Sequence, residues 1–178
     1  KEDIIINRAI WDVAEKGKLT NLDEIIQFVK DEKPLNPIFV DCTASYDLPN
    51  RYLDILEAGM HITTPNKRAN SMSMDFYHQL RKTANSMHRR FLYETNVGAG
   101  LPIIDTLQNL FKSGDKLTGF YGIMSGSLSY IFGRLYEGVS FSCVVIEARE
   151  NRYTVPDPRD VLAGLDVARK ALIIAREA

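Results

Sequence analysis

The sequence predicts an α/β fold built around a parallel sheet. Three apolar runs of strand length, 37–45, 60–66 and 89–96, alternate with segments of helical periodicity in the first half of the chain. This alternation is typical of βαβ units, whose strands lie parallel in one sheet. The run 37–45 ends in small polar residues, which is the pattern of a buried parallel strand.

Helices are predicted between and after these strands from apolar spacing and from end signals. The segment 19–32 presents one apolar face, and Thr20 or Asn21 can cap its start. The segment 48–59 has a proline near its start and Gly59 past its end. Further helices are expected at 73–87, 103–114, 128–138, 141–151 and from about 160 to the end, with one more strand at 115–125.

The composition is that of a globular protein of the cytoplasm. The chain has 178 residues and a net charge of −1, so electrostatics favours neither nucleic acid nor a membrane surface as a partner. No apolar run approaches the roughly 20 residues of a membrane span, and no signal peptide is evident. Cys42 lies in an apolar run and is expected to be a small buried thiol. The chain begins with Lys1 rather than methionine, which predicts a fragment or a processed start.

The residue pattern changes after "VGAGLP", and this change predicts two lobes, 1–97 and 98–178. The stretch "GAGLPI" at this boundary lacks the third glycine of the dinucleotide fingerprint G-x-G-x-x-G. Its position between a strand and a helix leaves two alternatives open. Free backbone N–H groups can meet an anion there, or the glycines serve a tight turn that needs positive φ.

The carboxyl ends of the predicted strands are the expected place for a ligand. They carry the segments "CTAS", "TPNKRAN" and "ETNVGAG". Lys67 directly follows the second predicted strand. From local sequence, this lysine either donates to a carboxylate or a cofactor, or is solvated in a loop.

The last predicted helix carries Asp166 and Lys170 one turn apart among aliphatic residues. This helix is apolar nearly all round, so we expect it to be well buried. A pair at this spacing is either an ordinary solvated ion pair or a buried, hydrogen-bonded carboxylate and amine, which is a candidate functional site. The sequence leaves both alternatives open.

Five motifs in order resemble one family. They are "VDCTAS", "TPNKRAN", "ETNVGAGLPII", "GIMSGSLSYIFG" and "PDPRDVLAGLDVARK", and they follow the order found in homoserine dehydrogenases. The stretches "MDFYHQLR" and "EGVSFS" look most like the bacterial form that is fused behind an aspartokinase. The resemblance covers the chain from about residue 36 to its end.

The resemblance implies an α/β fold with a partial Rossmann-like parallel-sheet lobe followed by a partial α/β substrate lobe. It implies reduction of aspartate 4-semialdehyde to homoserine with NADP or NAD as cofactor, on the way to threonine and methionine. The expected partners are this small amino-acid substrate, further copies of the chain and a fused aspartokinase. Neither nucleic acid nor a membrane is expected as a partner.

The family's functional residues map onto matching positions of this sequence. Thr43 and Lys67 would face the nicotinamide cofactor and the substrate, with Lys67 also catalytic. Lys170 would give or take the proton at the substrate oxygen, with Asp166 beside it. A positioned cation can stabilise the negative charge that develops on oxygen during hydride transfer and can supply the proton.

A monovalent metal site is also implied by the resemblance. The Glu94 carboxylate and the backbone carbonyls of Val97, Ala99 and Leu101 would bind sodium or potassium. An all-oxygen shell of this kind suits a hard cation.

Two valines depart from the family pattern. The family has a glutamate where this chain has Val155 and an aspartate where it has Val161. The glutamate is expected to hold the substrate ammonium, and losing such a charge-assisted contact costs roughly 1.5–3 kcal/mol. The family's glycine-rich phosphate loop is also missing. These departures leave two rival hypotheses: a catalytically impaired scaffold or oligomerisation module, and a dehydrogenase for a substrate without an amine.

Overall fold

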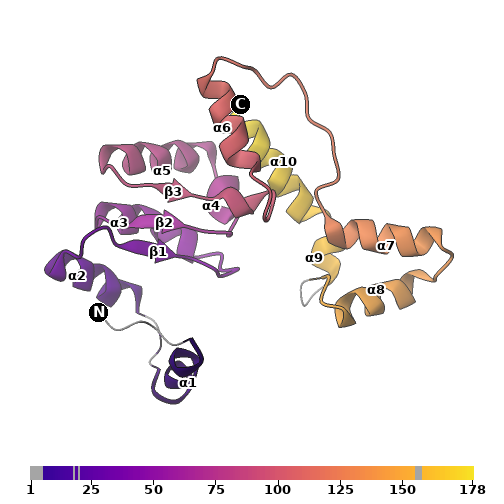
Figure 1. Ribbon diagram of the computed structural model, residues 1–178, viewed down its shortest axis with the longest axis horizontal. Helices are drawn as coiled ribbons and strands as arrows, with labels where there is room; N and C mark the ends of the chain where they lie inside the picture. The colour runs from indigo at the N-terminus through magenta and orange to yellow at the C-terminus, as the bar shows by residue number, and fades with distance from the viewer. Residues whose placement is uncertain (1–5, 18, 20, 155–157) are drawn as a thin grey trace.

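Three parallel strands form the sheet of the chain, shown in Figure 1 as a computed structural model that describes residues 6–17, 19, 21–154 and 158–178. The strands lie in the order β1 (Ile38–Val40), β2 (His61–Thr63) and β3 (Phe91–Leu92). Both strand pairs are parallel. The predicted α/β class and the parallel arrangement are therefore confirmed.

Helices precede and connect these strands, and apart from the first of them and one short helix they lie where the sequence predicts them. In chain order they are α1 (Ile6–Lys16), α2 (Leu22–Glu32), the 3-10 helix η1 (Leu48–Arg51), α3 (Tyr52–Glu57), α4 (Arg68–Ser71) and α5 (Met74–Ser86). Asn21 caps α2, because its side chain accepts hydrogen bonds from the backbone N–H groups of Asp23 and Glu24. Gly59 follows α3 with a φ of +92°, a conformation that glycine adopts without strain. The short helix α4 was not predicted.

One apolar core holds the sheet and its helices together. It is formed by side chains from α2, α3, α5 and β2, and Tyr52, Ile55, Leu56, Ile62 and Leu80 within it have no exposed surface. Burial of apolar area on this scale is the main stabilising contribution in a fold of this size. The core fixes the directions in which β1 and β2 end.

The predicted burial of the first strand is wrong. Ile38 and Val40 are 64% and 59% exposed, whereas Phe39 between them packs against the core. Side chains alternate between the two faces of a strand, so one face of β1 is covered and the other is open among the described residues. β1 is also an edge strand of the sheet.

The second half of the described chain is helical. Its elements are η2 (Glu94–Asn96), α6 (Ile103–Lys112), α7 (Gly126–Tyr136), α8 (Phe141–Glu150), α9 (Pro158–Leu162) and α10 (Leu165–Glu177). The predicted strand at 115–125 is wrong, since no residue of this segment is in a strand. Tyr121 and Ile123 are 98% and 85% exposed. A strand needs a paired neighbour for its backbone groups, and the described residues place none beside this segment.

The predicted single helix at the C-terminus is interrupted. Gly164 has a φ of +70° and separates α9 from α10. The expectation that this helix is buried on all sides is also wrong. Ile173 and Ile174 are buried, but Leu165 and Leu172 are 48% and 38% exposed.

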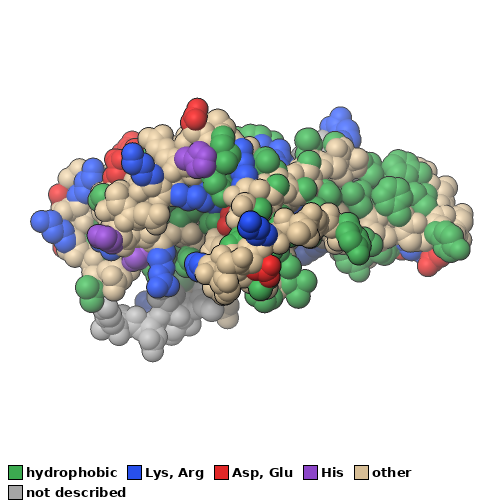
Figure 2. Space-filling model, turned by 90° about the horizontal axis from the view of Figure 1, so that it is seen from above, with side chains coloured by type: hydrophobic (Ala, Val, Ile, Leu, Met, Phe, Trp, Pro, Cys, Tyr) green, Lys and Arg blue, Asp and Glu red, His purple; other side chains and the backbone are tan. Residues whose placement is uncertain are grey.

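The helix α10 returns from the second half of the chain to pack against α4 and α6 (Figure 1). The helices α7 and α8 form an antiparallel pair set to one side of the sheet and joined to α10 through α9 (Figure 1). Apolar side chains gather on the surface at this end of the molecule (Figure 2). Among the described residues, no helix is long and apolar enough to span a membrane. Cys42 and Cys143 are both exposed, so the predicted burial of Cys42 is wrong.

Candidate functional site

A buried polar network joins the loops that follow β1 and β2. Asp41 is 1% exposed, and its carboxylate accepts hydrogen bonds from the Tyr52 hydroxyl and from Asn66 Nδ2 at 3.3 Å. Thr64 Oγ1 donates to the Asp41 carbonyl at 2.9 Å and accepts from the Asn66 N–H at 2.9 Å. Asn66 Nδ2 also donates to the Ser45 carbonyl at 3.0 Å. These bonds hold the two loops side by side at the carboxyl edge of the sheet.

Thr43 lies in the first of these loops and is exposed. Its backbone N–H donates to the Asp41 carboxylate at 2.8 Å, and its hydroxyl oxygen accepts from the Ser45 N–H at 3.1 Å. The backbone at Thr43 is thus fixed by a buried carboxylate, while the surface of the residue faces outward. This is the location expected for a cofactor contact at the carboxyl edge.

The structure brings Lys67, Asp166 and Lys170 together although Lys67 is about 100 residues distant in the chain. Asp166 Oδ1 lies 3.2 Å from Lys67 Nζ, and Asp166 Oδ2 lies 2.8 Å from Lys170 Nζ. The side chains of Lys67 and Lys170 are 23% and 15% exposed, and that of Asp166 is 45% exposed. Lys170 Nζ also donates to the Met124 carbonyl at 2.7 Å. Both lysine side chains are therefore paired and mostly buried, unlike the solvated lysine and solvated ion pair that the sequence left open as alternatives.

Two opposing effects set the pKa of Asp166. Partial burial raises it, but the hydrogen bond from Lys170 and the charge of Lys67 outweigh burial and hold the pKa below its ordinary value of 3.8. Asp166 is therefore a carboxylate at neutral pH. One negative charge then holds two ammonium groups in place.

A cavity of about 470 Å³ opens in the second half of the chain. It is lined by Gly126, Ser127, Tyr130 and Tyr153, at the start of α7 and after α8. Gly126 and Ser127 follow Met124, whose carbonyl binds Lys170, by only two and three positions. The Tyr130 and Tyr153 rings contact each other edge to face, with centroids 4.8 Å apart. These cavity residues were not predicted from the sequence, although "SGSLSY" carries the N-cap signal of α7.

Glu94 caps the helix α6. Its two carboxylate oxygens accept hydrogen bonds of 2.8 Å from the N–H groups of Ile104 and Asp105. A carboxylate at a helix N-terminus is stabilised by the unpaired N–H groups and by the helix dipole. This structural role was not predicted from the sequence.

The segment after Glu94 forms a tight turn. The Leu101 N–H donates to the Gly98 carbonyl at 2.8 Å, and a Cβ on Gly98 would lie 2.5 Å from the Leu101 carbonyl oxygen. Ala99, rather than a glycine, has the positive φ of 50°. Among the described residues, no group of three or more His, Cys, Asp or Glu side chains lies together. A cation here would therefore depend on Glu94 and backbone carbonyls, a donor set that suits a hard monovalent ion.

Several buried polar residues near the site were not predicted from the sequence. Tyr52, Asn66, Asn70 and Asn96 are linked to the loops that end β1 and β2 by hydrogen bonds over long sequence separations. The available signal was the recurrence of asparagine after β2 and β3, in "TTPN" and "ETN". Val161 is half-buried, and Val155 lies outside the described residues.

The fold and the site define a Rossmann-like α/β protein with a lysine–carboxylate cluster near the carboxyl edge of its sheet. Comparison with known families identifies it more closely. The family model for the NAD binding domain of homoserine dehydrogenase matches residues 6–94, and the model for homoserine dehydrogenase matches residues 102–178. The chain belongs to the homoserine dehydrogenase family.

Individual proteins similar to this chain include one curated relative and two solved structures. The chain is 50% identical over 175 residues to a bifunctional aspartokinase/homoserine dehydrogenase of Haemophilus influenzae, covering 97% of this chain and 22% of the relative. It resembles a solved Candida auris protein of unknown function with a TM-score of 0.79 and 40% identity, over 90% of this chain and 46% of the other. A hyperthermophilic archaeal homoserine dehydrogenase solved in complex with NADPH shares the fold, with a TM-score of 0.73 and 23% identity over 98% of this chain and 55% of the other. The chain thus spans about a fifth of the length of its bifunctional relative.

Proposed function

We propose that the protein containing this chain reduces aspartate 4-semialdehyde to homoserine with NADPH or NADH, as a step toward threonine and methionine. The observation that carries the proposal is the cluster of Lys67, Asp166 and Lys170, in which one carboxylate pairs with two ammonium groups. Family membership supports the reaction class. The position of Lys67 after β2 supports the proposal, because ligands of this fold class bind at the carboxyl edge of the sheet.

The two lysines are suited to the charge that develops in this reaction. Hydride addition to an aldehyde carbon leaves negative charge on the oxygen, and a cation already in place stabilises it. Lys170 Nζ is held by Asp166 and by the Met124 carbonyl. An ammonium group fixed at two points need not reorganise to donate a proton to that oxygen. Asp166 holds Lys170 and Lys67 close together.

The loops after β1 and β2 would hold the nicotinamide cofactor, with Thr43 and Lys67 as its contacts. NADPH or NADH would supply the hydride when bound. The match to the family's NAD binding domain supports this placement. The buried carboxylate of Asp41, bonded to the Thr43 N–H and to Asn66 Nδ2, orients both loops.

The cavity beside α7 would hold the substrate. Gly126 and Ser127 are the first residues of α7, and the N-terminus of a helix attracts a carboxylate.

Glu94 and the carbonyls of Val97, Ala99 and Leu101 would bind sodium or potassium. The all-oxygen donor set and the tight turn at 98–101 support this site. Such an ion would lie near the N-terminus of α6 and would brace the connection between β3 and the second half of the chain.

The partners expected from the sequence belong to the same proposal. The bifunctional relative supports a fused aspartokinase. The open face of β1 supports association with further copies of the chain, since Ile38 and Val40 are exposed there. The cytoplasmic location stays a prediction.

The rival function is that of a catalytically impaired scaffold. It is motivated by Val155 and Val161, which stand where the family has carboxylates. If these valines disable the substrate site, the cluster of Lys67, Asp166 and Lys170 would persist as a frame without turnover.

The test is the consumption of NADPH by the full-length protein with aspartate 4-semialdehyde. It is run on the protein as it stands and on the double variant Val155→Glu, Val161→Asp. Turnover by the unmodified protein supports the proposal. Turnover only after the carboxylates are restored supports the impaired scaffold, and turnover only with aldehydes that lack the α-amine supports a shifted substrate. If neither protein consumes NADPH with any of the aldehydes, the proposal is contradicted.

A further inference from the structure

The helix α10 is fixed to the first half of the chain at both of its ends. Near its start, Asp166 binds Lys67. At its end, Glu177 and Arg176 contact residues of α4, α5 and the segment after β3. Asp166 and Glu177 are eleven positions apart on α10, which is about 16 Å along the helix axis. Any shift at the second anchor is therefore carried along a rigid element to the first.

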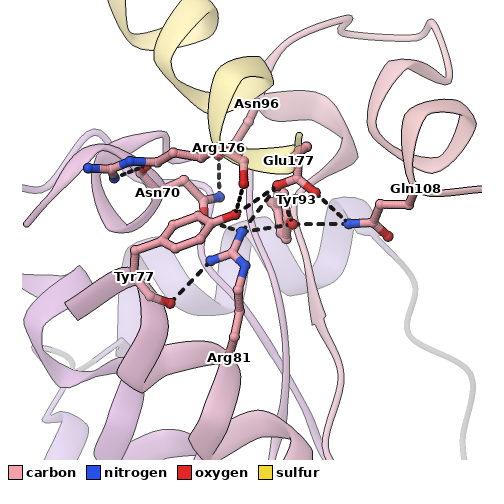
Figure 3. Close-up of polar contacts among 8 residues, drawn as sticks. All are labelled: Asn70, Tyr77, Arg81, Tyr93, Asn96, Gln108, Arg176 and Glu177. Atoms are coloured by element: carbon pink, nitrogen blue, oxygen red, sulfur yellow. Dashed lines mark hydrogen bonds and ion pairs between the residues drawn. The ribbon is translucent and has the colours of Figure 1, made fainter. Parts of the chain in front are cut away.

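Glu177 forms the centre of the second anchor (Figure 3). Its side chain is 5% exposed. Oε1 accepts hydrogen bonds from the Tyr93 hydroxyl at 2.7 Å and from Arg81 Nη2 at 3.2 Å, and Oε2 accepts from Gln108 Nε2 at 2.9 Å. These donors come from α5, from the end of β3 and from α6. One carboxylate thus joins three separate elements to α10.

Arg81 extends this anchor toward the loop that carries Lys67. Arg81 Nη2 donates to Asn70 Oδ1 at 3.2 Å, and Asn70 Nδ2 donates to Asn96 Oδ1 at 3.0 Å. Asn96 Nδ2 in turn donates to the Thr64 carbonyl at 2.9 Å. Thr64 lies three positions before Lys67. A continuous set of hydrogen bonds therefore connects the end of α10 to the loop whose lysine binds the start of α10.

Arg176 strengthens the same connection. Its guanidinium donates to the Asn70 carbonyl at 2.6 Å and to the Met72 carbonyl at 2.8 Å. Both carbonyls lie in or directly after α4, the helix whose N-cap is Lys67. The Tyr77 hydroxyl donates to the Arg176 carbonyl at 2.9 Å.

The phenols of the anchor are donors over the whole physiological pH range. Burial raises the pKa of Tyr77 to about 12 and also raises the pKa of Tyr93. The buried charges of Arg81 and Glu177 compensate each other, and removing one would leave the other without its counter-charge. The arrangement therefore depends on both members of the pair.

We infer that Glu177 and Arg81 are positioning residues that set where α10 lies and so fix Asp166 and Lys170 against Lys67. The inference rests on the proposed function for its effect on catalysis. Neither residue touches the cavity or the lysine cluster. They act through α10 on one side and through Asn70, Asn96 and Thr64 on the other.

The test compares Glu177→Gln with the parent in the full-length protein. Glutamine keeps the shape of the side chain and removes its charge. We expect kcat to fall about tenfold or more while KM for NADPH stays within about twofold, because the loops after β1 and β2 keep their own Asp41 network. Asp54→Asn is the matched control, since Asp54 also pairs with an arginine, Arg51, but lies on α3 away from α10. It should leave both constants within about twofold of the parent.

A second readout does not depend on turnover. Hydrogen–deuterium exchange of the α10 amides should rise in Glu177→Gln and stay unchanged in Asp54→Asn. Unchanged exchange in Glu177→Gln overturns the inference whether or not the protein is active. Raised exchange with unchanged kcat overturns the positioning role. If the parent itself has no turnover, the proposed function fails while the exchange result still decides whether the anchor holds α10. If Glu177→Gln does not fold, Tyr93→Phe removes one hydroxyl of the anchor and should shift kcat and exchange in the same directions by a smaller amount.

Discussion

At the scale of single residues, the site depends on one carboxylate between two ammonium groups. Asp166 holds Lys67 and Lys170 at 3.2 and 2.8 Å. The four-residue spacing of Asp166 and Lys170 can be recognised in the sequence, but the contact between Lys67 and Asp166 cannot. Lys67 reaches Asp166 because α4, whose N-cap is Lys67, packs against α10, and no local pattern encodes that contact. The same holds for Glu177, whose partners Arg81 and Tyr93 lie 96 and 84 positions away.

The lowered pKa of Asp166 has a consequence for stability. A carboxyl group with a folded-state pKa below its ordinary value contributes stability that is present above that ordinary value and is lost as pH falls through the folded-state pKa. Parent and Asp166→Asn should therefore differ in urea midpoint at about pH 7, and the difference should shrink below the ordinary value of 3.8. The difference should be small because Asp166 is nearly half-exposed.

Urea titrations of both proteins at about pH 7 and at about pH 3.5 measure this change. A difference that grows on acidification would mean that the lysines do not stabilise the charged form of Asp166.

At the scale of elements, the break at Gly164 decides how the last helices lie. The apolar pattern continues across this glycine, and for that reason the sequence predicts one helix where the structure has two. The positive φ of Gly164 turns the chain so that α10, rather than a longer helix, packs on α4 and α6. The segment 115–125 differs from its prediction for a related reason. Its apolar, β-favouring residues predict a strand, but strand pairing depends on a neighbouring strand and not on local preference alone.

Gly164→Ala should destabilise the protein. A side chain at positive φ costs about 1 kcal/mol, although a Cβ there would meet no atom within 4 Å. Gly133→Ala is the matched control, because Gly133 lies inside α7 with equally open surroundings. Alanine there should stabilise by about 0.5–1 kcal/mol, following its higher helix propensity.

Unfolding by urea, followed by circular dichroism, compares the two variants. Equal effects of the same sign at the two glycines would show that the conformation of Gly164 is not what separates α9 from α10.

At the scale of the whole molecule, the sheet has one open side. The parallel order of the strands follows from the sequence, because strands and helices alternate. The exposure of Ile38 and Val40 does not follow from the sequence, because an apolar run looks alike whether its strand is covered or uncovered. Open edges and apolar faces promote association.

The 178-residue chain expressed alone should therefore self-associate. Val40→Lys, which places a charge on the open face of β1, should shift the chain toward smaller species. Sedimentation velocity over a range of concentrations measures both. A parent chain that is monomeric throughout that range would show that the exposed face of β1 is not an association surface.

The most direct test of the proposed reaction is the rate of NADPH oxidation with aspartate 4-semialdehyde by the full-length protein, for the parent, Lys170→Ala and Lys116→Ala. Lys116 is exposed in the segment between α6 and α7 and serves as the control. Loss of a positioned proton donor costs about 10²–10⁴-fold in rate, so Lys170→Ala should lose activity by that factor while Lys116→Ala retains it. Equal rates for the parent and Lys170→Ala would contradict the assignment of the cluster of Lys67, Asp166 and Lys170 as the reacting site.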